Sequence, residues 1–224
     1  QYHSTLMVLS CALEDAAAFR GSLTSSVFGA LSLNEQAELR PVSWIGTDAS
    51  LEPKRNHDGS IRLGEDGLPE IEAGYGWVDH QLKVYACGDL REIHSELAGL
   101  FGGDHKLIIF VAEVLTAVAG AVEFGRDWSG HLKGVPIDNS NGYYAFRSFR
   151  SSNDVVRFFL GVLARAIVGH GFEFAPFWVW TKHNELPDLL SRDFGEGDAA
   201  IQTLVDTRVG PGYRRVNLMP QMRK

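Results

Sequence analysis

The sequence has few sulfur-containing residues and no long hydrophobic run. Among its 224 residues there are only two cysteines and three methionines. Cys11 and Cys87 lie far apart without a CxxC spacing, which excludes a disulfide framework and a zinc ribbon. No run approaches the roughly 18 consecutive apolar residues of a membrane helix, because the richest window, 107–122, contains Glu113 and Thr116. We therefore expect no membrane-spanning segment and an intracellular protein, cytoplasmic or nuclear.

The signature motifs of several enzyme classes are also missing. The eight histidines form no HxxxH or HExxH spacing, so the sequence does not predict a catalytic zinc site on a helix. There is no GxSxG sequence, which excludes the nucleophile elbow of many hydrolases. Gly99, Gly102 and Gly103 lack the strand-to-helix context of a phosphate-binding loop. Zinc, acyl-transfer and nucleotide-binding chemistry are thus disfavoured.

What is present is an ordinary globular composition, with 45% hydrophobic and 22% charged residues. The length fits one large domain, or one domain with flanking arms. A net charge of −7 argues against a general nucleic-acid coat protein, because neutralising phosphates requires positive charge. The chain begins at Gln1 without a basic and apolar leader, so we expect a segment of a longer polypeptide.

Hydrophobic periodicity predicts alternating strands and helices in the middle of the chain. Strands are expected at 41–48, 74–78, 82–87, 132–137 and 172–180, and helices at 108–124, after a turn at 138–142, at 154–168 and at 185–191. This order is typical of an α/β protein with one sheet covered by helices. We expect an N-terminal arm at 1–40, a core domain at 41–192 with an acidic insertion at 51–73, and a C-terminal arm or linker at 193–224 with a short helix at 199–206.

Four acids lie on four separate expected elements. Asp48 and Asp138 end strands, Asp188 begins the last core helix, and Glu113 lies in an apolar helix. Any single acid at a strand end more often begins a turn or caps a helix. Glu113 differs because its neighbours are apolar, and a buried unpaired carboxylate is strongly unfavourable. It is therefore expected to need a cation.

Several converging carboxylates would repel one another unless they hold divalent ions. Ligation by oxygen alone suits Mg²⁺ or Mn²⁺ better than zinc. Two such ions about 4 Å apart can clamp the attacking and leaving oxygens of a phosphodiester. The four acids therefore indicate metal-dependent phosphodiester hydrolysis.

The segments around these acids carry a family resemblance. They read GTDAS at 46–50, VAEVLTA at 111–117, PIDNSNGYYA at 136–145 and VWTKHNELPDLLSR at 179–192. Together they resemble the ribonuclease H domain of retroelement reverse transcriptases. The last segment is the most specific and is similar to domains that follow the polymerase in retrotransposons, especially the tyrosine-recombinase (DIRS) type. The resemblance covers about 41–192, and the arm 1–40 would then be the connection to the polymerase.

The resemblance implies a ribonuclease H-like five-stranded mixed sheet flanked by helices. It also implies that Asp48, Glu113, Asp138 and Asp188 are the catalytic residues and hold two Mg²⁺ or Mn²⁺ ions. The implied activity is endonucleolytic hydrolysis of the RNA strand of RNA–DNA hybrids during reverse transcription, with a reverse transcriptase domain in the same polyprotein as partner. The chain departs from the family at Pro187, where alanine is common, and in a longer gap between the first two acids, filled by 51–73 and 91–106.

The same comparison suggests residues that bind the substrate. They are Asn139, Asn141, Arg147, Arg150, Lys182, His183 and Asn184. Arginines after the third acid could contact phosphates or form a solvated helix entrance. The two asparagines could contact a 2′-hydroxyl or cap the next helix, and His183 could be merely solvated. Trp178 and Trp180 could be core residues or could stack on bases.

Two other functions remain open on the sequence. The negative net charge and the acidic insertion fit a ribonuclease H-like module that is catalytically inactive and serves in structure or protein interaction. Clustered acids also occur in related folds that act on DNA, such as integrases and junction resolvases. The fourth segment favours the ribonuclease branch.

Overall fold

The computed structural model describes residues 42–56, 58–64 and 69–222, which include a six-stranded mixed sheet. The strands are β1 (Val42–Pro53), β2 (Ile71–Asp79), β3 (Val84–Asp89), β4 (Leu132–Ile137), β5 (Glu173–Trp178) and β6 (Arg214–Arg215), in the spatial order β5-β4-β1-β2-β3-β6. β1, β2 and β3 pair antiparallel, whereas β1–β4, β4–β5 and β3–β6 pair parallel. The predicted α/β class with a mixed sheet is confirmed. The sixth strand is a two-residue addition to the five that were expected.

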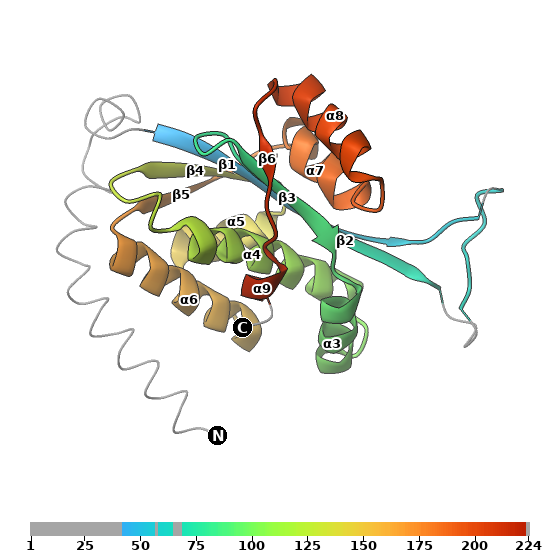
Figure 1. Cartoon of the computed structure of the whole chain (residues 1–224). Helices are drawn as coiled ribbons and strands as arrows, with labels where there is room; N and C mark the ends of the chain where they lie inside the picture. Colours follow the sequence, from blue (N-terminus) through green and yellow to red (C-terminus); the bar gives the residue numbers. More distant parts are fainter. Residues whose placement is uncertain (1–41, 57, 65–68, 223–224) are drawn as a thin grey trace.

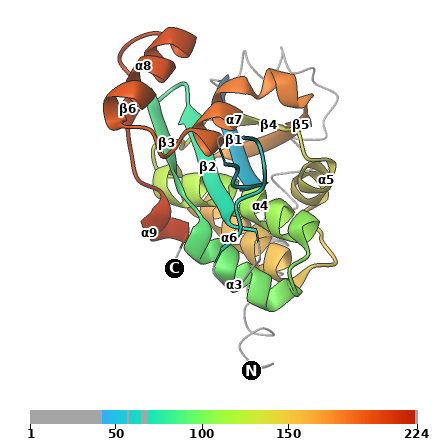
Figure 2. The ribbon, with the colours of Figure 1, turned by 90° about the vertical axis from the view of Figure 1, so that its right-hand side faces the viewer.

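Helices cover both faces of this sheet (Figure 1). They are α3 (Arg91–Phe101), α4 (His105–Phe124), α5 (Ser140–Ser148), α6 (Asp154–His170), α7 (Glu185–Arg192), α8 (Asp198–Val209) and α9 (Met219–Met222), with a 3-10 turn η1 (Thr181–His183) before α7. Figure 2 shows α7 and α8 on one side of the strands and α3, α4 and α6 on the other. The expected helices at 108–124, 154–168 and 185–191 correspond to α4, α6 and α7.

The central helix α4 forms the middle of the hydrophobic core. Asp104 caps its start by accepting hydrogen bonds from the backbone nitrogens of Lys106 and Leu107. Among the described residues it is the one helix long and apolar enough to cross a membrane, and 72% of its apolar window is buried inside the fold. Its hydrophobicity therefore matches its contacts with the sheet and α6.

Two expectations about the strands near Asp48 were wrong. β1 does not end at Asp48 but continues to Pro53, so Asp48 lies inside the strand. The stretch 51–73 is also not a simple loop, because β2 begins at Ile71 and bridges link Arg55 to Ile61 and Leu63 to Pro69. Cross-strand pairing thus prolongs the β1–β2 ribbon away from the body of the molecule (Figure 1).

The segment expected to be a C-terminal arm or linker is instead folded onto the sheet. Ile201 and Val205 of α8 are buried against a small cluster that includes Tyr85 and Cys87. Further on, β6 pairs with β3, and Leu218 is completely buried in the main core. Apolar side chains at helical spacing supply these contacts. The expected arm 1–40 lies outside the described residues.

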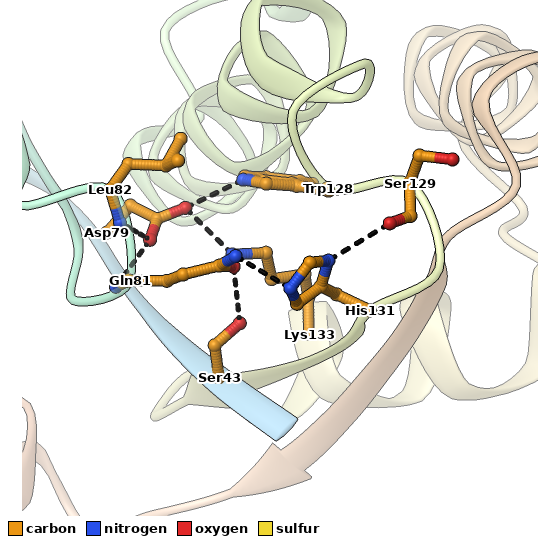
Figure 3. Close-up of polar contacts among 8 residues, drawn as sticks. All are labelled: Ser43, Asp79, Gln81, Leu82, Trp128, Ser129, His131 and Lys133. Carbon is orange, nitrogen blue, oxygen red and sulfur yellow. Dashed lines mark hydrogen bonds and ion pairs between the residues drawn. The ribbon is translucent and has the colours of Figure 1, made fainter. Parts of the chain in front are cut away.

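A buried ion pair ties together β2, β4 and the loop before β4 (Figure 3). The Nζ of Lys133 lies 3.0 Å from Oδ2 of Asp79, and both side chains are fully buried. The indole nitrogen of Trp128 donates to the same oxygen at 2.6 Å, while the backbone nitrogens of Gln81 and Leu82 donate to Oδ1. Both Asp79 oxygens are therefore satisfied, as a buried charge requires.

Candidate active site

Three of the four predicted acids converge at one place in the fold. Asp48 comes from β1, Glu113 from α4, and Asp138 directly follows β4. One carboxylate oxygen from each lies within 4.8 Å of the other two. The parallel pairing of β1 with β4 and the packing of α4 on β1 bring these elements together.

Asp48 is buried, with 6% of its surface exposed. The hydroxyl of Ser191, on α7, donates to its Oδ2 at 2.6 Å. Burial is the main cause that raises the pKa of Asp48 to about 7; the Ser191 bond opposes the rise, and the charges of Asp138 and Asp188 add to it. Without a cation, Asp48 is therefore held in an environment unfavourable to its charge.

Glu113 is the least compensated acid of the site. Its Oε2 is buried and has no hydrogen-bond partner among the described residues. Burial raises the pKa of Glu113 well above its usual value, and the charges of Asp48 and Asp138 raise it further. A hydrogen bond with the Asn139 side chain lowers the pKa of Glu113 and so offsets part of this rise. A buried acceptor without a donor is costly and points to a missing partner.

Close packing of α7 on the sheet positions the side chains around Asp48. A Cβ atom at Gly76 would lie 2.0 Å from the carbonyl oxygen of Pro187, and one at Gly74 would lie 2.1 Å from that of Ser191. Only glycine permits this approach of helix to strand. Pro187 is tolerated in the first turn of α7, where a backbone donor has no helical acceptor. The GYG sequence at 74–76 thus lets Ser191 reach Asp48.

Asp188 lies beside the three-acid cluster rather than within it. Its Oδ1 pairs with Nη2 of Arg192 at 3.0 Å, and Arg192 also contacts Glu52 on β1. Asp188 is near enough for its charge to raise the pKa of Asp48, while the charge of Arg192 lowers it. The structure therefore brings Asp188 to the edge of the site, where an arginine already partners it.

The predicted binding residues on α5 separate into a cap and an exposed group. Asn139 is the N-cap of α5 and accepts from the backbone nitrogens of Asn141 and Gly142, which confirms the capping interpretation. Asn141, Arg147 and Arg150 are exposed. Arg147 donates to the Tyr143 hydroxyl at 2.8 Å, one turn earlier on the same helix. The exposure of these three residues leaves them accessible to a substrate.

The loop before α7 contains one residue that cannot meet a substrate. Lys182 and His183 are exposed on η1. Asn184, expected to bind substrate, is 2% exposed, and its Nδ2 donates to the Thr47 carbonyl at 2.9 Å. Its amide is used to fasten this loop to β1 next to Asp48. The expectation of direct contact was therefore wrong, because only packing reveals that the amide points inward.

Two residues with clear roles at the site had no assigned role on the sequence. Ser191 holds Asp48, and Arg192 neutralises Asp188. Both lie in the quoted string that ends LLSR, four or fewer residues after Asp188. Their position one helical turn beyond an acid was the available signal, because residues three and four apart share a helix face.

The donor set suits a divalent cation. It consists of carboxylate oxygens, includes one buried oxygen that has no partner within 42–56, 58–64 and 69–222, and contains two acids whose pKa values are raised by burial and mutual repulsion. Hard cations such as Mg²⁺ and Mn²⁺ prefer these ligands. Asp48, Glu113 and Asp138 are therefore compatible with a divalent metal site.

Comparison with known proteins gives little beyond this geometry. No family model matches the chain, and no curated protein sequence matches it. Among solved structures, it is similar to RNase H1 from the halophilic archaeon Halobacterium salinarum NRC-1, with 16% identity and a TM-score of 0.38, over 68% of this chain and 96% of that one. The chemistry of the site is therefore inferred from its own residues, Asp48, Glu113 and Asp138, and from what surrounds them.

Proposed function

We propose that this chain is a metal-dependent nuclease domain that hydrolyses the RNA strand of an RNA–DNA hybrid. The observation that carries the proposal is the convergence of Asp48, Glu113 and Asp138, with the Oε2 of Glu113 buried and without a hydrogen-bond partner in the described part of the chain. Carboxylates that repel one another in a buried cluster are typical of a functional site that binds a cation.

Asp48, Glu113 and Asp138 would hold Mg²⁺ or Mn²⁺, with Asp188 as a peripheral fourth acid. When two such ions are bound, they supply an activated water and stabilise the leaving oxygen of a phosphodiester. Ser191 keeps the Asp48 carboxylate in place, and Arg192 limits the negative charge that Asp188 adds. Exposed Arg147 and Arg150 are suited to hold substrate phosphates.

The choice of substrate rests on the resemblance of 179–192 to the ribonuclease H domains of retroelements. We extend the proposal on the same ground to an endonuclease that acts during reverse transcription, joined in one polyprotein to a reverse transcriptase. An RNA–DNA hybrid offers 2′-hydroxyls on one strand alone, and these allow a protein to select RNA from DNA. Asn141 is exposed at the start of α5 and is a candidate for that contact.

The test is cleavage of an end-labelled hybrid, beside duplex RNA and duplex DNA, in Mg²⁺, in Mn²⁺ and in EDTA. Wild type should cut the RNA strand of the hybrid alone, only with metal, and Asp138→Asn should lose the activity. Asp154→Asn is the matched control, because Asp154 is an exposed acid on α6 paired with Arg157. Unchanged hybrid cleavage by Asp138→Asn would show that the assignment is wrong.

Negative results can also be interpreted. Cleavage of duplex DNA instead of the hybrid would favour the integrase or resolvase branch. A lack of cleavage together with a lack of Mg²⁺ or Mn²⁺ binding by titration calorimetry would favour an inactive structural module. Metal binding without cleavage would call for a repeat with the reverse transcriptase domain attached.

A further inference from the structure

Three of the five tryptophans are exposed, and two of these lie side by side. Trp77 and Trp128 are completely buried, whereas Trp44, Trp178 and Trp180 are 47%, 42% and 63% exposed, and Trp178 neighbours Trp180. Their ring centroids lie 4.7 Å apart, with an angle of 68° between the ring planes. Neighbouring large apolar side chains at a surface can mark an interaction site, unlike single scattered ones. The notion that these residues are core is therefore wrong for both.

This tryptophan pair, Trp178 with Trp180, lies at the same end of the sheet as the acids. In the β4–β5 pairing Trp178 is opposite Ile137, the residue that precedes Asp138. The backbone nitrogen of Val179 donates to the Ile137 carbonyl at 3.0 Å. The pair is thus held in a fixed register one residue from an acid of the cluster.

The chain after the pair is also fixed to the site. The backbone nitrogen of His183 donates to the Trp180 carbonyl at 2.7 Å, and Asn184 is fastened to Thr47 beside Asp48. Lys182 lies between Trp180 and Asn184 in the sequence. It is exposed and forms no ion pair with any residue in the described part of the chain. Two exposed indoles and an exposed lysine therefore lie within five residues of one another along the chain, at 178–182.

Aromatic faces with a neighbouring cation suit nucleic acid, because bases stack on the rings and the cation meets a phosphate. A paired base inside a duplex already has neighbours on both faces, so it has no free face for an indole. An unpaired base has a free face on which an indole can stack. Two rings at 68° form a corner in which one base can stack on one ring and contact the other.

We propose that Trp178 and Trp180 stack on an unpaired base next to the hybrid, so that the domain prefers hybrids that end in a single-stranded overhang. The inference deepens the proposed function and rests on it for the position of the hybrid at the acids. Stacking on each base by an aromatic residue commonly changes affinity about tenfold. An overhang should therefore strengthen binding about tenfold or more over a blunt hybrid.

The test is fluorescence anisotropy in EDTA, which prevents cleavage, with blunt hybrids and with hybrids that carry a short DNA or RNA overhang. Wild type should bind at least one overhang substrate about tenfold more tightly than the blunt one. Trp178→Ala/Trp180→Ala should bind both with the blunt affinity, whereas Trp178→Phe/Trp180→Phe should keep most of the preference. Phe158→Ala, at an aromatic residue of α6 that is 53% exposed, should behave as wild type.

The inference fails if wild type binds blunt and overhang hybrids equally, or if the double alanine variant keeps the preference. The second result is also the one expected if the pair docks a protein. These readouts do not depend on catalysis, so they separate the two proposals. Overhang preference that disappears in the alanine variant supports stacking even if no hybrid is cleaved, and cleavage of blunt and overhang hybrids alike leaves the proposed function in place.

Discussion

The sheet carries two buried acids, Asp48 and Asp79, in opposite electrostatic situations. Asp79 is fully buried and receives Lys133, an indole nitrogen and two backbone nitrogens, so its charge is matched (Figure 3). Asp48 is 6% exposed, receives one hydroxyl, and faces Glu113 and Asp138. One acid is neutralised by the fold and the other is left to repel its neighbours.

Burial of a charge therefore does not by itself indicate function. A buried charge with all its partners belongs to the architecture, because removing it leaves other groups unpaired. A buried charge without a compensating cation weakens the fold, and a cluster of such charges is typical of a site where a ligand supplies the missing charge. The Asp48 cluster is therefore expected to respond to metal and pH, and the Asp79 pair to mutation of its partners.

The largest effect is expected at the matched acid. Lys133→Met leaves the Asp79 charge buried without its cation, and such a loss typically destabilises a protein by about 3 to 5 kcal/mol. The free energy of unfolding from urea titration measures it. Lys106→Met, at an exposed lysine of α4, should change stability little, and Lys133→Met/Asp79→Asn should recover part of the loss. A mild effect of Lys133→Met alone would contradict the matched-charge description.

The second largest effect is expected on the metal affinity of the cluster formed by Asp48, Glu113 and Asp138. Glu113→Gln removes the buried carboxylate charge, and Mg²⁺ or Mn²⁺ affinity by calorimetry should fall about 100-fold or more, since even outer partners of a metal site contribute 10 to 100-fold. Glu123→Gln, an exposed position on the same helix, is the control and should bind as wild type. Equal affinities of the two variants would remove Glu113 from the metal site.

A smaller effect is expected from removing the Asp48 charge, and it should stabilise the metal-free protein. Burial raises the pKa of Asp48 from its ordinary value of 3.8 to about 7, so between these pH values the folded state binds a proton that the unfolded state has released. Stability should therefore fall as pH rises from about 4 to 7. Asp48→Asn in EDTA should raise the unfolding free energy at neutral pH by on the order of 1 to 3 kcal/mol, after allowance for relaxation.

That gain should shrink as pH is lowered, because Asp48 becomes neutral in the wild type as well. Urea titrations of both proteins across pH 4 to 8 would trace it. Saturating Mg²⁺ should reverse the order, since metal that binds the folded wild type stabilises it. A variant less stable than wild type in EDTA at neutral pH would show that Asp48 is better compensated than its partners suggest.

The smallest effect is expected at the exposed rim of the site. Arg192→Ala breaks contacts to Asp188 and Glu52 while its side chain is 42% exposed, so solvent already screens them. The unfolding free energy should change by about 1 kcal/mol or less. Thermal unfolding beside Arg208→Ala, which breaks a comparable pair with Glu185, gives the comparison. A much larger loss would class Arg192 with Lys133.

The sequence predicted much of the fold and three acids of the cluster. Helices such as α4 and α6, and strands such as β4, follow from strong local periodicity, and Asn139 followed by Ser140 and Asn141 is a recognisable helix start. α3 was missed because its stretch, 91–101, has only Ile93 and Leu97 as buried residues. The β1–β2 extension was read as a loop because cross-strand pairing, unlike a helix, depends on residues distant in sequence.

The two tryptophan positions and Asn184 show the same limit at the site. Alternation along a strand cannot tell an edge position from a central one, so Trp178 read as core although β5 is the outer strand of the sheet. The amide of Asn184 could point either way along its loop, and only the nearby Thr47 carbonyl decides its direction. Such facts depend on neighbours that sequence separation hides.

By itself, the sequence determined the class of the fold, the order of its main elements and the identity of the acids, because these follow from local patterning and residue chemistry. Tertiary structure alone decided which acids converge, which buried charge is matched and which is not, and that 198–222 belongs to the packed body. These depend on desolvation and on distances between elements far apart in the chain. Asp48 and Asp79 cannot be distinguished in the sequence, and the groups that surround each carboxylate in the fold decide its role.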